Sequence, residues 1–196
     1  MTPKLPDFSN LLLIAATGSN VGKTTLATAI LQNLNKDLNI IALKVSPHFH
    51  QIEGNRKILE QTENYMIVEE QDEISGKDTS KLIRAGAKKA YLVHGNEEFV
   101  IEAFLKLFST FPSNQPVICE SAGLAYHIKA GLLILLKREG YDKKNIFDQL
   151  KDKADIIITS DGQQFDRDIS DIGFEDGRWI HRSISFNMTT FKKLSY

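Results

Sequence analysis

The chain has 196 residues, a hydrophobic fraction of 42% and a charged fraction of 25%, which suit one globular domain and exclude collagen-like, mucin-like and largely disordered proteins. The 24 Lys and Arg residues nearly balance the 25 Asp and Glu residues, so no net charge favours nucleic acid or an anionic membrane as a partner. The single cysteine, Cys119, excludes an intrachain disulfide framework and a multi-cysteine metal site within the chain.

The N-terminal residues do not have the pattern of a targeting or membrane segment. Met1–Asn10 contains Lys4, Asp7 and two prolines rather than a basic region that leads into a cleavable apolar run. The apolar stretch Leu11–Thr17 is far shorter than the roughly 20 residues of a transmembrane helix. We therefore expect an uncleaved cytoplasmic protein without a membrane span.

Short apolar runs alternate with amphipathic stretches along the chain. The apolar runs predict strands at Leu11–Ala16, Asn39–Val45, Ala90–His94, Pro116–Glu120, Leu132–Lys137 and Asp155–Thr159. Apolar residues at helical spacing predict helices at Lys23–Asn35, Asp78–Ala87, Glu97–Phe108 and Lys144–Lys151. Because the strands are almost continuously apolar, they suit burial on both faces, which predicts an α/β fold with a mainly parallel sheet between layers of helices.

Two segments depart from this alternation. Residues 51–75 are rich in acidic residues around one apolar run, Tyr65–Val68, and predict an insertion: either a solvated helix followed by an edge strand, or a lid that binds a partner. Residues 169–186 contain the turn sequence Glu175–Arg178 between aromatic residues, which predicts a terminal hairpin. We expect one domain over residues 1–196, with no internal repeat.

The strongest motif lies between the first predicted strand and the first predicted helix. Residues 16–25 read Ala-Thr-Gly-Ser-Asn-Val-Gly-Lys-Thr-Thr, which has the strand-loop-helix context of a phosphate-binding loop, although Thr17 stands where the usual pattern has its first glycine. Backbone N–H groups of such a loop bind phosphate, its lysine contacts the β- and γ-phosphates, and its hydroxyl residue ligates Mg²⁺. We therefore predict a nucleotide site formed by Gly18, Ser19, Asn20, Val21, Gly22, Lys23, Thr24 and Thr25. In this site Lys23 is catalytic and Thr24 is a ligand of the metal.

This loop resembles that of a branch of P-loop proteins. The branch contains dethiobiotin synthetase, cobyrinic acid a,c-diamide synthase and the molybdopterin-guanine dinucleotide biosynthesis adapter proteins. Position 18 is Gly, so the chain lacks the additional early lysine of the partitioning and cell-division ATPases in this branch. The resemblance implies a three-layer P-loop NTPase fold and GTP or ATP with Mg²⁺ as ligands.

Two further blocks resemble the adapter family more specifically. Leu43–His50 is similar to a strand that ends in Ile-Lys-His before paired histidines, and Ser75–Ala87 is similar to Gly-Lys-Asp-Ser leading to Ala-Gly-Ala. The chain departs from the family at Val45, where the adapters have histidine. We expect Lys44 to neutralise a phosphate and to be catalytic, as Lys23 and Glu120 are. His48 and His50 either hold a metal or substrate or pack the loop.

Asp78, in the second block, has two interpretations. It is a candidate metal-site residue beside the nucleotide, and it is also a candidate N-cap of the following helix.

Acidic residues end two later strands. Glu120 follows the apolar residues 117–119 and precedes Ser-Ala-Gly, which has the form of a Walker B motif, so we expect it to hold Mg²⁺ or its water, with a plain buried acid as the alternative. Asp161 follows the strand predicted at 155–159 and could accept hydrogen bonds from guanine, or could belong to an ordinary turn. The choice between GTP and ATP stays open.

These observations predict a nucleotide-binding protein with weak NTPase activity that resembles the adapter family and aids cofactor synthesis or delivery. By the same resemblance we expect a homodimer and a cofactor-biosynthesis enzyme as partner, and no nucleic acid or membrane partner. The alternative is an ATP-dependent, carboxylate-activating synthetase or small-molecule kinase of the dethiobiotin synthetase type.

Overall fold

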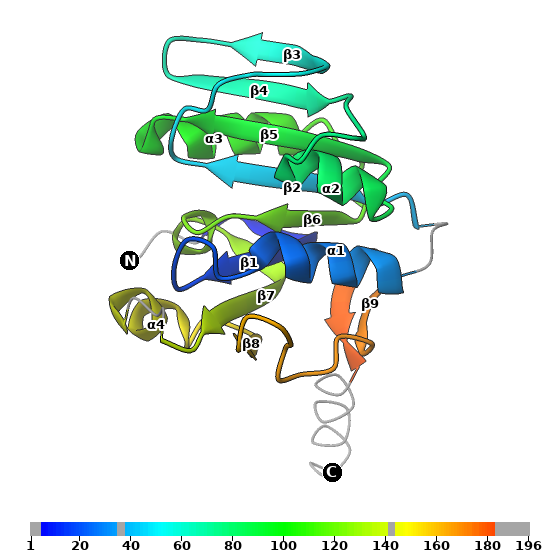
Figure 1. The fold of residues 1–196 in the computed structure, drawn as a ribbon, viewed down its shortest axis with the longest axis vertical. Coiled ribbons are helices and arrows are strands. Elements are labelled where there is room, and N and C mark those ends of the chain that lie inside the picture. Colours follow the sequence, from blue (N-terminus) through cyan, green and yellow to red (C-terminus); the bar gives the residue numbers. More distant parts are fainter. Residues whose placement is uncertain (1–4, 35–37, 141–143, 183–196) are drawn as a thin grey trace.

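A computed structural model describes residues 5–34, 38–140 and 144–182. Its centre is an eight-stranded sheet with the order β3-β4-β5-β2-β6-β1-β7-β8 (Figure 1). The strands of this sheet are β1 (Asp7–Ala16), β2 (Ile41–Ser46), β3 (Arg56–Gln61), β4 (Tyr65–Glu70), β5 (Lys89–Gly95), β6 (Val117–Glu120), β7 (Lys129–Arg138) and β8 (Ile156–Ser160). From β5 to β8 all neighbouring strands are parallel, whereas β3–β4 and β4–β5 are antiparallel. The expected mainly parallel α/β sheet is confirmed.

Helices cover both faces of the sheet. They are α1 (Lys23–Asn33), α2 (Asp78–Arg84), α3 (Glu97–Phe108), α4 (Lys144–Leu150) and a short 3₁₀ turn, η2 (Leu124–Tyr126). Apolar residues of α1 and α2 pack against one face, and those of α3 and α4 pack against the other. Along β1, Leu12 and Ile14 face the first group while Leu11 and Leu13 face the second, because successive side chains of a strand point to opposite faces. This explains the continuous apolar runs that the sequence shows.

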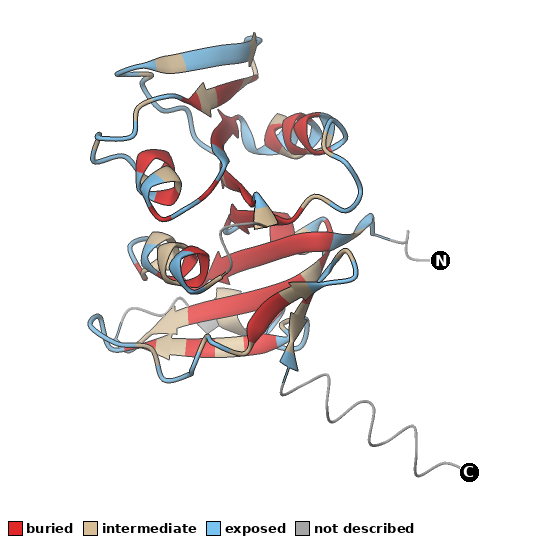
Figure 2. Ribbon diagram, turned by 90° about the vertical axis from the view of Figure 1, so that its right-hand side faces the viewer, coloured by how far each residue is buried: buried red, intermediate tan, exposed pale blue. Residues whose placement is uncertain are grey.

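The acid-rich segment at residues 51–75 differs from one of its two interpretations. It contains no solvated helix; it forms the antiparallel pair β3 and β4, and β3 is the edge strand of the sheet. Ile58, Leu59 and two further residues of β3 are exposed to solvent, whereas most of β4 is buried, as the pale blue and red strands at the top of Figure 2 show. The helix expectation was wrong because the segment before Tyr65 satisfies its backbone groups as β3, by pairing with β4, which a local pattern does not reveal.

The C-terminal part of the described chain is a separate two-stranded hairpin, β9 (Ile172–Glu175) and β10 (Arg178–His181). It packs on the α1 side, where Trp179 is buried and its indole Nε1 donates to the Asn10 carbonyl at 2.9 Å. Residues 183–186 of the predicted hairpin segment lie outside the described residues. Cys119 is fully buried on the opposite face, and burial raises the pKa of its thiol well above the usual value.

Candidate functional site

The predicted phosphate-binding loop, Lys44, Glu120 and Asp78 meet at one edge of the sheet. The loop connects β1 to α1, and β6 lies between β1 and β2, so Glu120 pairs in register with Ile14 on one side and Lys44 on the other. Parallel strands present their carboxyl ends at the same edge, which is where open α/β sheets bind ligands. Asp78 reaches this edge from the first turn of α2.

The phosphate-binding loop has the backbone conformation of an anion site. Gly22 has a φ of 107° and immediately precedes α1, a left-handed conformation that a residue with a side chain adopts only under strain. Asn20 is also left-handed, with a φ of 57°. The side chains of Ser19, Asn20 and Thr25 are exposed, whereas Val21 is buried in the α1-side core. Val21 therefore contributes only its backbone to any ligand contact.

Lys23 bends back over the loop. Its Nζ lies 3.4 Å from the Gly18 carbonyl oxygen, at the long limit of a hydrogen bond. Burial lowers the pKa of Lys23, and Lys44 lowers it further, while Glu120 and Asp78 act in the opposite direction. An anion such as a phosphate would relieve both the loss of hydration and the repulsion between the two lysines.

Thr24 and Glu120 form the centre of the predicted metal site. The Thr24 hydroxyl donates to Glu120 Oε2 at 2.8 Å, and Glu120 Oε1 is buried with no hydrogen-bond partner among the described residues. Burial raises the pKa of Glu120, while Lys44, Thr24 and Lys23 lower it. A hydroxyl and a carboxylate are hard oxygen ligands, and Mg²⁺ typically binds to one or two carboxylates, phosphate oxygens and water. The pair fits Mg²⁺, which would supply charge neutralisation beside the phosphates.

Lys44 and Asp78 bring together the two blocks that resemble the adapter family. Lys44 Nζ forms an ion pair with Asp78 Oδ2, and Lys81 contacts the other carboxylate oxygen at 3.2 Å. Asp78 is the first residue of α2; the N-cap is Lys77, and no side chain caps this helix. The interpretation of Asp78 as a side-chain N-cap is therefore wrong, and its carboxylate instead orients Lys44 at the cleft.

The histidines after β2 form a contact network of their own. His50 Nε2 lies 2.8 Å from the Ser46 hydroxyl, and the His50 backbone N–H donates to Nδ1 of His94 at 2.9 Å. Burial lowers the pKa of His94 to about 4, and burial also lowers that of His50. Within the described ranges, no three or more His, Cys, Asp or Glu side chains gather as a metal cluster. This network supports the loop-packing interpretation of His50.

Asp161 directly follows β8 and is not among the residues that line the phosphate cleft. Its Oδ1 accepts hydrogen bonds from the backbone N–H groups of Gln163 and Gln164 at 2.7 and 2.8 Å, which is an Asx-type turn. These two hydrogen bonds lower the pKa of Asp161, and the nearby Arg138 lowers it further. Arg138 also donates to the Asn20 carbonyl at 3.4 Å, so it lies between this turn and the nucleotide loop. Recognition of a base by Asp161 stays a prediction.

Together these residues enclose a cleft of about 560 Å³, which we call the phosphate cleft. Its walls include Lys23, Thr24, Lys44, Asp78 and Glu120. The volume lies within the range of about 300–1,000 Å³ that is typical of small-molecule sites. The cleft therefore has the size and the charged groups for a nucleotide triphosphate tail with its metal.

Sequence reasoning missed three residues beside the cleft. Lys81 lines the cleft, and His94 accepts the backbone N–H of His50 in the loop after β2. Arg56 lines a neighbouring cavity together with Asp78. His94 ends the predicted strand Ala90–His94, so the rule that ligands bind at carboxyl ends of strands could have identified it. No local signal marked Arg56, because its partners Glu70 and Thr79 come from other elements.

Comparison with known protein families agrees with this geometry. The family model for the CobQ/CobB/MinD/ParA nucleotide binding domain, CbiA, matches residues 12–175, a range that runs from β1 to β9 and includes the whole phosphate cleft. The chain belongs to the CbiA family. It is therefore a P-loop nucleotide-binding protein, of a family that usually binds its nucleotide with Mg²⁺. No curated protein and no solved structure gave a significant match.

One further finding concerns membranes. Among residues 5–34, 38–140 and 144–182, no helix of this CbiA member is long and apolar enough to span a bilayer.

Proposed function

We propose that this protein binds GTP or ATP with Mg²⁺, hydrolyses it slowly and acts in the cytoplasm as an adapter in the synthesis or delivery of a nucleotide-bearing cofactor. The observation that carries the proposal is the contact between Lys44 and Asp78. These residues belong to the two sequence blocks that resemble the molybdopterin-guanine dinucleotide adapters, and they meet beside the Thr24–Glu120 pair. The resemblance also supports a homodimer and a cofactor-biosynthesis enzyme as partner.

The residues of the phosphate cleft divide the work of binding. The backbone of residues 18–22 and the start of α1 surround the phosphates, and Lys23 neutralises their charge. Thr24 and Glu120 hold Mg²⁺, which lowers the charge on the β- and γ-phosphates. Lys44 gives up its ion pair with Asp78 to contact the terminal phosphate, so that nucleotide binding exchanges one ion pair for another.

Slow hydrolysis follows from the groups that the cleft offers. Glu120 is a candidate base by its chemistry, but its Oε2 already accepts from Thr24, which fixes it toward the metal. Lys23 and Lys44 stabilise negative charge on the terminal phosphate and cannot remove a proton from water while they are charged. Such a cleft binds and senses nucleotide better than it turns it over.

A second candidate is an ATP-dependent synthetase or small-molecule kinase. A cavity of about 510 Å³ adjoins the phosphate cleft and shares Lys44, His50 and Asp78 with it. A synthetase needs space of this kind for the group that receives the terminal phosphate. The adapter hypothesis has more support because it accounts for both sequence blocks.

Calorimetric titration with Mg²⁺-GTP and Mg²⁺-ATP, followed by phosphate release without a further substrate, separates the two. The adapter hypothesis predicts preference for GTP and slow or absent turnover. ATP preference, with turnover that begins only when a small carboxylic acid or amine is added, would favour the synthetase. For the variant Lys23→Met, which removes the lysine of the phosphate-binding loop, the matched control is Lys57→Met, since Lys57 is an exposed lysine outside the phosphate cleft.

A further inference from the structure

A second cavity lies beside the phosphate cleft, and we call it the hairpin cavity. It has a volume of about 510 Å³ and lies between the segment 49–56 that leads into β3, the start of α2 and Leu92 of β5. It shares Lys44, His50 and Asp78 with the phosphate cleft, so these side chains border both spaces. This volume suits a small organic molecule rather than a single ion.

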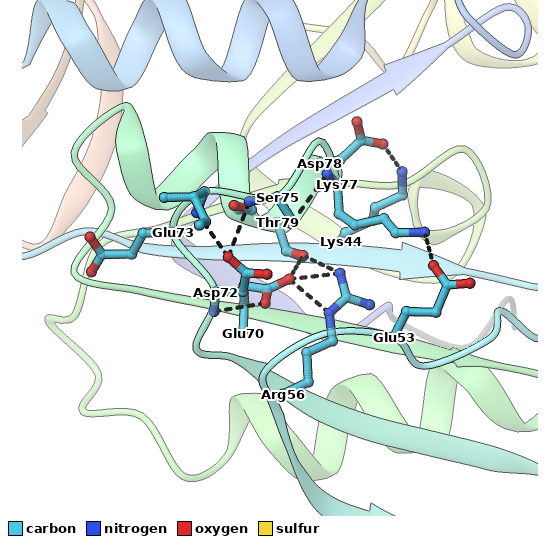
Figure 3. A network of polar contacts seen from close by, with 12 residues as sticks. Lys44, Glu53, Arg56, Glu70, Asp72, Glu73, Ser75, Lys77, Asp78 and Thr79 are labelled. Carbon is cyan, nitrogen blue, oxygen red and sulfur yellow. Dashed lines mark hydrogen bonds and ion pairs between the residues drawn. The ribbon is translucent and has the colours of Figure 1, made fainter.

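A buried guanidinium forms part of its wall. The Arg56 side chain is 5% exposed and is held by Glu70, which is 1% exposed, with Nε and Nη2 at 2.9 and 2.7 Å from Oε2. Nη2 also reaches the Thr79 hydroxyl at 3.2 Å. Nη1 has no partner among the described residues, and Figure 3 shows it turned away from Glu70. The remaining N–H groups of Arg56 are thus donors that the protein leaves for the cavity.

All the Lys and Arg side chains that line the hairpin cavity, Arg56 included, have a carboxylate partner. Lys44 contacts Asp78, and Lys77 contacts Glu53 at 2.8 Å (Figure 3). Arg56 has a fixed position because Glu70 and Thr79 hold two of its three nitrogens. Recognition of an oxyanion by a positioned guanidinium costs less side-chain entropy than recognition by a mobile surface lysine.

Apolar groups complete the cavity. Phe49 is 48% exposed, an unusual state for a large aromatic residue, and it lines the cavity together with Leu92. A ligand that covers Phe49 would remove apolar surface from water, which is favourable by about 25 cal/mol per Å². The lining therefore matches a molecule with one oxyanion and one apolar part.

We propose that the hairpin cavity binds a small organic oxyanion, a carboxylate or a phosphate ester, with its charged group at Arg56 and its apolar part against Phe49. The position of this ligand next to the terminal phosphate rests on the proposed nucleotide function, whereas its contact with Arg56 does not. Because Lys44 and Asp78 border both spaces, nucleotide and oxyanion change each other's affinity, and the factor is the same in both directions.

The test uses three probes with a common ring: phenylacetate, phenyl phosphate and the uncharged benzyl alcohol. Each is titrated calorimetrically into the full chain and into Lys23→Met, which lacks the phosphate-loop lysine. We expect at least one anion to bind both proteins and benzyl alcohol to bind about tenfold more weakly or not at all, since hydrogen bonds to charged groups contribute about 1.5–3 kcal/mol. A preference for phenylacetate identifies a carboxylate ligand, and a preference for phenyl phosphate identifies a phosphate ester.

Variants locate the site. Arg56→Lys keeps a cation for Glu70 but lacks the further guanidinium N–H groups that would bind the anion, so we expect about tenfold weaker anion binding. Lys57→Met, on the same strand, should leave anion binding unchanged. Phe49→Ala removes an exposed side chain without disturbing the core, so it tests the cavity even if Arg56→Lys fails to fold, and we expect severalfold weaker binding.

The failure of this proposal is distinguishable from failure of the nucleotide proposal. No saturable anion binding up to the millimolar range, equal binding of benzyl alcohol, or loss of all anion binding in Lys23→Met would overturn the hairpin-cavity proposal while leaving nucleotide binding intact. Anion binding without any nucleotide binding would support the cavity contact and overturn the nucleotide proposal.

Discussion

The two halves of the carboxyl edge of the sheet are built in different ways. In the half around β1, the phosphate cleft is built on one local segment, residues 19–25 at the β1–α1 connection, to which the strand ends at Lys44 and Glu120 add charged groups. In the half around β3 and β4, the polar network joins Arg56, Glu70 and Thr79 from three separate elements. The first half is therefore defined by local chemistry, and the second by tertiary contacts.

This difference separates two kinds of function. Lys23, Thr24 and Lys44 of the phosphate cleft are partly exposed, so their substitution should change nucleotide affinity more than folding. The Arg56–Glu70 pair is almost fully buried, so its substitution should change folding before anything else. The experiments below test this separation, from the largest expected effect to the smallest.

Arg56→Met should destabilise the protein by about 3–5 kcal/mol, because it leaves the buried Glu70 carboxylate without its cation. Urea unfolding measures this loss. The double variant Arg56→Met/Glu70→Leu should recover most of it. The exposed pair Lys77–Glu53 is the matched control, since its side chains are 48% and 58% exposed and Lys77→Met should cost under about 1 kcal/mol. An equal, small effect at both pairs would refute the structural role of Arg56.

Lys23→Met should weaken nucleotide binding about 100-fold, because a charge-assisted contact to phosphate and the neutralisation of Glu120 are both lost. Equilibrium titration with Mg²⁺-GTP and Mg²⁺-ATP measures the change. The unfolding free energy without nucleotide should change little, since burial lowers the pKa of Lys23 and its charge is only partly compensated. Undiminished affinity would remove the basis for the phosphate-loop assignment.

Glu120→Gln should weaken nucleotide binding about tenfold with Mg²⁺ and hardly at all with EDTA, because a neutral amide is a poor Mg²⁺ ligand. Thr24→Val should give the same pattern. Since both residues act on one ion, the double variant should lose little more than either single variant. An equal loss with and without Mg²⁺ would argue that Glu120 acts on the fold or on the nucleotide directly.

His94→Asn should make stability less dependent on pH below neutrality. Burial, with His50 and Arg56 nearby, lowers the pKa of His94 from 6.5 to about 4, so the unfolded chain binds a proton that the folded chain refuses between these values. His94 therefore stabilises the fold fully above pH 6.5, and this contribution falls with decreasing pH by at most about 1.4 kcal/mol per pH unit. Asn keeps an acceptor for the His50 N–H but does not titrate. The measurement is the unfolding free energy of both proteins at pH 7, 6 and 5. It should fall more steeply with decreasing pH for the unsubstituted protein than for His94→Asn, and equal slopes would show that His94 is not the titrating group.

Much of the fold was predictable from the sequence because burial on both faces produces continuous apolar runs. All six predicted strands and all four predicted helices exist, with changes at their ends: the helix predicted to reach Ala87 ends at Arg84, and the end of the first predicted helix, Asn35, lies outside the described residues. A strand at Tyr65–Val68 was anticipated in one interpretation and exists as β4, but it is not the edge strand. β3 was missed because it carries mostly exposed side chains and is held by its neighbour rather than by its own pattern.

The candidate site was predictable where its residues end strands or form the loop. Lys44 and Glu120 were both found by their position after apolar runs, and the structure brings them to the same face in register. Arg56 and the hydrogen-bond acceptor role of His94 were not, because each depends on which distant residues the folded chain places beside it. Val21 was predicted as a site residue from its place in the loop motif, which does not reveal that its side chain belongs to the core.

The most direct test of the central claim is a calorimetric titration of the full chain with GTP and with ATP, each in the presence of Mg²⁺ and again with EDTA. We predict saturable binding of at least one nucleotide to one site per chain, and a clear loss of affinity when Mg²⁺ is removed, because Thr24 and Glu120 provide a place for the ion next to the phosphates. Absence of binding for both nucleotides with Mg²⁺ present, or an affinity that Mg²⁺ does not change, would contradict the account.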